Sequence, residues 1–196
     1  MARRIPEKRS YRQTRRAEQT ADTRRRIVDA AVQLHSTVGP ARSTLSMIAE
    51  KAGVQRHTLY AHFPDERSLL MACSGETMAR DPFPDAAPWR NIAPGLPRLK
   101  QGLIEIYDWY RRNASLAACV LRDAESHDLV REISDLRWGP RLALVIEVLS
   151  EGLNQKQMPL LRLAISFHTW RSLVQESGLD TRQAAETGAA MLTKRA

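Results

Sequence analysis

Apolar residues recur along the chain at the spacing of helices rather than of strands. From residue 23, Ile27, Ala31, Leu34 and Val38 follow one another at intervals of three or four, so they share one face of a helix. From residue 98 onward no run alternates between apolar and polar positions, and β-branched residues are sparse. The pattern predicts an all-α protein.

Turn-forming residues divide the first part of this pattern into four helices. Gly39-Pro40 ends the first helix, and the hydroxyl of Thr44 can cap the second. Gly53 then allows a left-handed turn before a short third helix over about residues 55–61, and Pro64-Asp65 begins a fourth. Two helices, a glycine turn and a short helix are the layout of a helix-turn-helix. The small core expected for it is Leu45, Ile48, Ala49, Val54 and Leu59.

The second part of the chain is predicted to be helical after a proline-rich loop. Residues 81–97 hold five of the ten prolines, which neither a helix nor a central strand would accept. A kink or a break is expected at Gly139-Pro140, and Thr181 is the expected cap of the last helix. The expected helices are 97–112, 115–125, 127–152, 159–177 and 181–194.

The helix predicted over 159–177 is apolar around most of its girth, which indicates burial on more than one side. We expect one of these sides to face a partner subunit, although a central helix of a monomer would show the same pattern. Small residues in the last helix also permit close packing between helices. The dimer-interface residues expected on this basis are Phe167, Trp170, Val174, Ala185, Ala189 and Leu192.

Positive charge is concentrated at the start of the chain. Residues 1–26 hold ten Lys and Arg against three Asp and Glu, a balance of +7 out of the net +8. Residues 1–22 show no apolar periodicity, so we expect a flexible basic arm there. A basic arm on a near-neutral body suggests a polyanionic partner, and the alternative is a solvated tail that only aids solubility.

The remaining composition excludes several classes of protein. Hydrophobic residues are 43% and charged residues 27%, which is ordinary for a soluble globular protein. Cys73 and Cys119 lie far apart, with no disulfide or zinc pattern. The charged N-terminus has no signal-peptide core, and the longest apolar run is far below the roughly 20 residues of a spanning helix. We expect a cytoplasmic location and no membrane partner.

Residues 44–70, TLSMIAEKAGVQRHTLYAHFPDERSLL, resemble the helix-turn-helix of the tetracycline-repressor-like (TetR/AcrR) transcription regulators. The likeness is close over about residues 23–71, and the remainder resembles the family only in being helical. The resemblance implies a homodimer on a near-palindromic DNA operator and a C-terminal helical domain that binds a small effector and dimerises. The implied domains are a basic flexible arm over 1–22, a DNA-binding domain over 23–71 and an effector-binding domain over 72–196.

The resemblance also implies which residues contact DNA. Thr44 and Tyr60 match positions that bind phosphate. The family often has a lysine where this chain has Glu66, so either Arg67 takes over that contact or the contact is missing. The expected contacts to bases or flanking phosphates are Gln55, Arg56, His57, Thr58 and His62. The charge density of the arm, and not the resemblance, suggests that it follows the minor groove, as basic arms do elsewhere, through Arg3, Arg4, Arg12, Arg15 and Arg16.

Aromatic and apolar residues of the second part are candidates for the effector pocket, although each is more readily explained as ordinary core. These candidates are Trp109, Tyr110, Leu121, Trp138, Phe167 and Trp170. We expect no cofactor and no metal, because His57 and His62 are five residues apart and so about 140° apart around a helix.

The leading hypothesis is a repressor that an effector releases from DNA. An activator or a ligand-independent regulator of the same fold is the alternative. A helical enzyme with a basic tail is a remote one, because the sequence shows no nucleophile–base pair and no phosphate loop.

Overall fold

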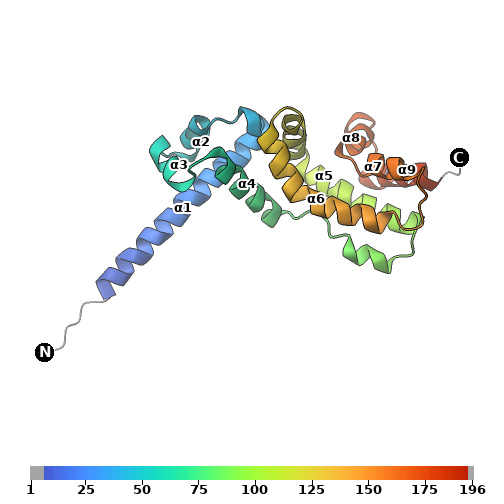
Figure 1. The fold of residues 1–196 in the computed structure, drawn as a ribbon, viewed down its shortest axis with the longest axis horizontal. Helices are drawn as coiled ribbons and strands as arrows, with labels where there is room; N and C mark the ends of the chain where they lie inside the picture. The colour runs from blue at the N-terminus through green and yellow to red at the C-terminus, as the bar shows by residue number, and fades with distance from the viewer. Residues whose placement is uncertain (1–6, 194–196) are drawn as a thin grey trace.

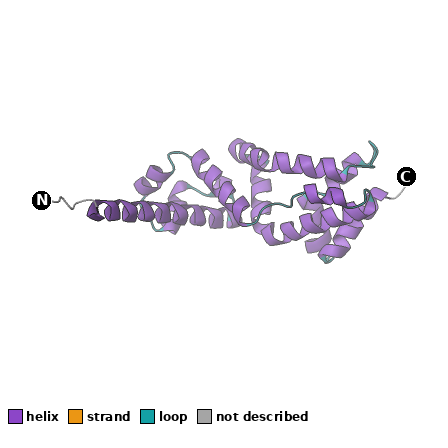
Figure 2. Ribbon diagram, turned by 90° about the horizontal axis from the view of Figure 1, so that it is seen from below, coloured by secondary structure: helices purple, strands orange, loops and turns teal. Residues whose placement is uncertain are grey.

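The structure is a computed structural model in which residues 7–193 are described, together with the side chains of residue 11 and residues 13–192. Every regular element within these residues is helical, which confirms the predicted all-α class (Figures 1 and 2). The long helices are α1 (Glu7–Thr37), α4 (Glu66–Arg80), α5 (Leu96–Ala124), α6 (Asp128–Leu149) and α9 (Thr181–Thr193). The short helices are η1 (Pro40–Arg42), α2 (Leu45–Ala52), α3 (Arg56–His62), η2 (Ala87–Asn91), α7 (Met158–Ala164), α8 (Phe167–Trp170) and η3 (Arg171–Glu176).

The first helix is much longer than the sequence predicted. α1 has 31 residues, so the expectation of a flexible arm is wrong for residues 7–22. Arg, Gln, Glu and Ala are good helix formers, and extending an existing helix avoids the cost of nucleation. In both views the first half of α1 extends beyond the other helices (Figures 1 and 2). Arg3 and Arg4 lie outside the described residues.

One hydrophobic cluster joins the first four helices. Ile27 of α1, Ile48 of α2, Leu59 of α3 and Leu69 of α4 are each at most 2% exposed within it. The predicted core of the helix-turn-helix is confirmed, with Ile48, Ala49 and Leu59 buried and Leu45 and Val54 packed against them.

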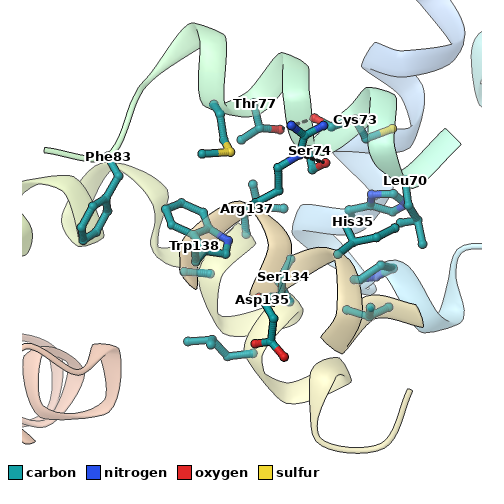
Figure 3. A pocket seen from close by; sticks show the side chains of 18 of the residues that line it. His35, Leu70, Cys73, Ser74, Thr77, Phe83, Ser134, Asp135, Arg137 and Trp138 are labelled. Atoms are coloured by element: carbon teal, nitrogen blue, oxygen red, sulfur yellow. Dashed lines mark hydrogen bonds between the residues drawn. The ribbon is translucent and has the colours of Figure 1, made fainter. Parts of the chain in front are cut away.

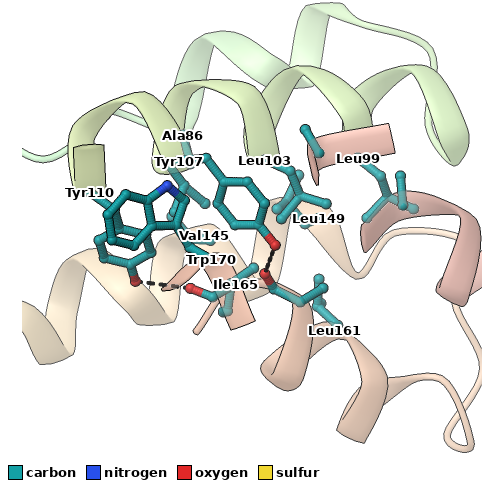
Figure 4. Packing of buried hydrophobic residues seen from close by; sticks show 14 of the residues in the cluster. Ala86, Leu99, Leu103, Tyr107, Tyr110, Val145, Leu149, Leu161, Ile165 and Trp170 are labelled. Atoms are coloured by element: carbon teal, nitrogen blue, oxygen red, sulfur yellow. Dashed lines mark hydrogen bonds between the residues drawn. The ribbon is translucent and has the colours of Figure 1, made fainter. Parts of the chain in front are cut away.

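A second cluster joins α5 to α6, α7, α8 and α9, with α9 packed against α5 (Figure 4). The helix predicted over 159–177 is interrupted in it, because α7 ends at Ala164 and the Ser166 hydroxyl caps α8. Tyr107 and Tyr110 of α5 donate hydrogen bonds to the Ala164 and Ile165 carbonyls at 2.7 and 2.9 Å. These bonds use carbonyls at the end of α7, where a helix leaves acceptors without partners in the helix itself.

Other predicted boundaries in the second part also change. The segments 97–112 and 115–125 form one helix, α5, in which only Asn113 departs from helical geometry. α6 continues through Pro140, so of the kink or break expected at Gly139-Pro140 the break does not occur. Asp180 rather than Thr181 caps α9, since its carboxylate accepts from the Gln183 amide at 2.8 Å.

The residues predicted to form a dimer interface lie inside this chain. Phe167, Trp170, Ala185, Ala189 and Leu192 are 0–3% exposed within the second cluster, and Val174 packs against it. Their burial needs no partner, because α5, α7 and α9 cover one another, so this assignment is corrected. Within residues 158–176 the exposed large apolar side chains are instead Leu160 and Leu163 of α7, at 36% and 51%.

α4 links the two clusters. The predicted boundary at 71/72 falls inside this continuous helix. Leu69 and Cys73 pack into the first cluster, whereas Leu70 packs with Val130 and Ile133 of α6 in a small third cluster. A displacement of α6 would therefore move α4, the helix that supports the helix-turn-helix. None of the described helices is long and apolar enough to cross a membrane.

Candidate nucleic-acid interface and adjoining cavity

Local sequence determines how α2 and α3 meet. The Thr44 hydroxyl accepts from the Met47 amide at 3.2 Å and so caps α2, as predicted. Gly53 ends α2 with φ 65° and ψ 37°, the left-handed conformation that glycine adopts without steric cost. α3 then begins after Gln55, whose side chain makes no capping hydrogen bond.

The outer surface of α3 carries polar side chains that the fold does not use. Gln55, Arg56, His57 and Tyr60 are exposed, and Thr58 and His62 are half-buried. None of these six side chains has a hydrogen bond or ion pair with another described residue. Leu59 and Phe63 fix the opposite side of the helix in the core at 0% and 1% exposure. The arrangement presents donors and acceptors on a rigid helix, as base reading in a major groove requires.

Two of the predicted phosphate contacts differ in their availability. The Thr44 hydroxyl accepts one hydrogen bond in capping α2, so its own proton is left for an outside acceptor. The Arg67 guanidinium instead forms two parallel hydrogen bonds with Glu132 of α6, at 2.7 and 2.6 Å. A phosphate contact by Arg67 stays a prediction, and it would compete with this ion pair.

Basic positions follow one side of the extended part of α1. At about 100° per residue, positions 8, 9, 12, 15 and 16 fall within about 120° of the helix circumference, and all five are Lys or Arg. Glu18 and Asp22 fall outside this arc, about 60° and 20° beyond the edge at position 15. Arg15 and Arg16 are exposed. We call the five positions 8, 9, 12, 15 and 16 the basic stripe of α1.

Comparison with known proteins identifies this unit. Residues 27–73 match the family described as "Bacterial regulatory proteins, tetR family". The helix-turn-helix unit is thus similar to that of the tetR family. Over 56 residues the chain is 41% identical to the HTH-type transcriptional regulator SrpR of Pseudomonas putida, a stretch that covers 29% of this chain and 26% of SrpR. The chain thus aligns with about a quarter of that relative's length.

The TetR-like fold extends over the rest of the chain. FadR of Bacillus subtilis, solved with stearoyl-CoA, superposes with a TM-score of 0.64 at 19% identity, over 86% of this chain and 97% of FadR. The fatty acid degradation regulator FadR of Bacillus halodurans gives 0.59 at 22% identity, over 87% and 94% of the two chains. The similarity shows that α5 to α9 share the architecture of these regulators.

A second candidate site is a cavity of about 270 Å³ where the two clusters meet (Figure 3). The cavity is lined by residues of α1 and α4 as well as of α5 and α6. The contributions of α1 and α4 are Val32, His35, Leu70, Cys73, Ser74, Thr77 and Met78. Burial raises the pKa of the Cys73 thiol to about 12, so this cysteine is a protonated, unreactive part of the wall.

Four of the six predicted pocket residues line this cavity, namely Trp109, Tyr110, Leu121 and Trp138. Phe167 and Trp170 do not, because they are packed in the second cluster, and their assignment to the pocket is corrected. Sequence reasoning missed His35 and Arg137 as lining residues. No local signal marks them, since one lies on α1 and the other on α6, about a hundred positions apart.

Proposed function

We propose that this chain is a TetR-family regulator that binds DNA sequence-specifically as a homodimer, a repressor released from its operator by a small molecule. One observation carries the proposal: α4 both supports the helix-turn-helix and lines the cavity. A ligand between α4 and α6 would displace α4 and with it the helix-turn-helix, the reading unit. A small change in the distance between the two α3 helices of a dimer is enough to lose the fit to two half-sites.

Base recognition is assigned to the outer side of α3. Arg56 can pair bidentately with guanine O6 and N7, and Gln55 with adenine N6 and N7, each worth about 1–3 kcal/mol of discrimination. Tyr60 and Thr44 would fix the register through phosphates. His57, Thr58 and His62 complete the surface, as contacts to bases or to flanking phosphates.

The basic stripe of α1 is assigned to the DNA backbone. A helix is about 10–12 Å wide with its side chains, whereas the minor groove is about 6 Å wide. Residues 7–22 therefore do not enter the minor groove as an extended arm would. Because they are helical, we infer that the stripe lies against phosphates and supplies salt-dependent, sequence-independent affinity. The contacts proposed for Arg3 and Arg4 lie outside the described residues.

Dimerisation is assigned to α7. Leu160 and Leu163 are one turn apart and exposed on α7. Apolar side chains that share a helix face are suited to packing against a second copy related by a two-fold axis. This placement replaces the one expected from the sequence.

Effector release is supported by the cavity and by the bound stearoyl-CoA in Bacillus subtilis FadR, a protein of the same architecture. An activator or a ligand-independent regulator would use the same α3 surface. The similarity of the helix-turn-helix to SrpR, an HTH-type transcriptional regulator, favours regulation over enzymatic activity. A cytoplasmic location stays a prediction.

The deciding experiment is a footprint of the full chain on the DNA that flanks its own gene. A protected site with two-fold symmetry is the expected result. Uniform protection without a preferred site would overturn sequence-specific regulation. Addition of a cavity ligand should then remove the protection.

A further inference from the structure

We propose that the cavity binds a compact organic carboxylate, an apolar body that carries a single carboxylate group, and that Arg137 is the residue that pairs with this group. The inference rests on the proposed function, because it names the chemical class of the effector. It follows from the lining of the cavity, from the partners of Arg137 and from the state of His35.

The cavity wall is mostly apolar and partly aromatic. Phe83, Trp109 and Trp138 contact one another edge to face, with ring centroids 5.2, 5.5 and 4.9 Å apart. Such a wall is suited to an apolar ligand body, flat or aliphatic. The volume of about 270 Å³ lies just below the range of about 300–1,000 Å³ that is usual for drug-sized ligands, so the ligand is compact.

Arg137 brings a positive charge to this wall without a negative partner. Its Nε donates to the Ser74 hydroxyl at 3.1 Å and its Nη2 to the Met71 carbonyl at 2.9 Å, both on α4. Both acceptors are neutral, and no carboxylate among the described residues pairs with Arg137. Arg67, Arg80 and Arg112, by contrast, each contact a carboxylate.

Asp135, the acidic residue of the lining, does not supply the missing charge. It is exposed, and Figure 3 shows its carboxylate on the side of α6 away from the Arg137 guanidinium. Solvent screens an exposed carboxylate. A carboxylate inside the cavity would instead face a half-buried guanidinium, to which it can bind through two parallel, charge-assisted hydrogen bonds. A cationic ligand would meet the same guanidinium as an uncompensated like charge.

His35 provides a second polar contact. Its side chain is 5% exposed, it lines the cavity, and its ring has no hydrogen bond with any described residue. Burial lowers its pKa to about 4, against the opposing effect of Asp123, so the ring is neutral near pH 7. A neutral imidazole has one donor and one acceptor nitrogen, and can bind a carbonyl or hydroxyl group of the ligand.

Binding of a carboxylate would also act on α4. An anion is a stronger partner for a guanidinium than a hydroxyl or a peptide carbonyl, so it would draw Arg137 away from Ser74 and Met71. Both residues lie on α4, within the first three turns after Glu66. The ligand would thus break two of the hydrogen bonds that join α6 to α4, the helix that supports the helix-turn-helix.

The test uses the full chain and three probe acids, hexanoate, octanoate and 3-phenylpropanoate, each compared with its primary amide and with the amine of the same skeleton. Titration calorimetry should show binding of at least one acid, about tenfold or more tighter than its amide, as loss of a charge-assisted hydrogen bond implies. In Arg137→Gln the acid should fall to the affinity of its amide. Arg141→Gln, one turn further along α6 and outside this cavity, is the matched control and should keep the preference.

Three results would overturn the proposal: no acid binds, an amide or amine binds as tightly as its acid, or Arg137→Gln keeps the preference. Ser74→Ala is a second variant that keeps Arg137 and removes one competing acceptor. It should bind the acid more tightly and the amide unchanged, and weaker acid binding would contradict the assignment. Operator binding by the ligand-free chain separates the two ideas. A symmetric footprint with no response to acids refutes the ligand class alone, whereas a missing footprint refutes the proposed function.

Discussion

Arg67 on α4 and Glu132 on α6 face each other with both hydrogen bonds of the pair in place, Nη1 to Oε2 at 2.7 Å and Nη2 to Oε1 at 2.6 Å. The Arg67 guanidinium holds the pKa of the Glu132 carboxyl below its usual range. His127 Nε2 lies 3.8 Å from Glu66 beside this pair. The start of α4, next to the reading unit, is thus attached to the helix that carries Arg137.

We expect Glu132→Gln to raise operator affinity severalfold, because it frees the Arg67 guanidinium to reach a phosphate. Fluorescence anisotropy with the footprinted operator measures this. Glu125→Gln is the control, since it removes the same charge from an exposed residue that has no ion pair with a described residue. An equal gain in both variants would mean that overall charge, and not release of Arg67, is responsible.

Arg56→Ala should weaken operator binding by about 1–3 kcal/mol and relax the base preference at one position of each half-site. Its side chain is exposed and makes no hydrogen bond with a described residue, so thermal stability should hardly change. Arg182→Ala on α9, also exposed, is the control for the loss of one positive charge. A large drop in Tm for Arg56→Ala would show that the residue is structural.

Replacing the five basic residues at positions 8 to 16 by Gln should flatten the dependence of operator affinity on salt. Each lost phosphate contact reduces the slope of log K against log salt by about 0.9. Gln is a good helix former, so the helicity measured by circular dichroism should persist. An unchanged slope would show that the basic stripe of α1 only aids solubility.

The helix-turn-helix was predictable because its determinants are local. The apolar set around Ile48 and Leu59, the cap at Thr44 and the turn at Gly53 lie within about twenty residues and act through backbone geometry. The same local reasoning failed at residues 7–22. A polar segment without apolar periodicity can be either disordered or helical. Here it is helical because it continues the helix that follows it in the sequence.

Burial across helices was harder to predict. Apolar residues around most of the circumference of residues 159–177 indicated two buried sides, one of them expected to face a partner subunit. Tyr107, Tyr110 and α9 of the same chain cover these sides instead. The cavity unites His35, Ser74 and Arg137, which only the packing of α1, α4 and α6 brings together. Periodicity tells which side of a helix is buried, but not what covers it.

His35 should make stability depend on pH. Its pKa is about 4 in the folded chain and about 6.5 when unfolded, so between these values the unfolded state binds one more proton. Stability therefore falls as the pH is lowered from about 6.5 to 4. Between pH 7 and 5 the free energy of unfolding should fall by about 2 kcal/mol less in His35→Leu than in the native chain, as measured by urea unfolding. Parallel losses in the two proteins would contradict the assignment to His35.

Replacing Leu160 and Leu163 by Ser should convert the proposed dimer into monomers. Both side chains are exposed in the single chain, so the change removes little from its own core, and surface substitutions of this kind usually alter stability by within about 0.5 kcal/mol. Analytical ultracentrifugation measures the change in mass, and circular dichroism checks that the helices persist. Leu136→Ser on α6, at 54% exposure, is the control for loss of an exposed leucine elsewhere. If Leu136→Ser dissociates the protein and the α7 variant does not, the two-fold interface lies on α6. That outcome would place it beside Arg137, where a ligand would then act on the dimer as well as on α4.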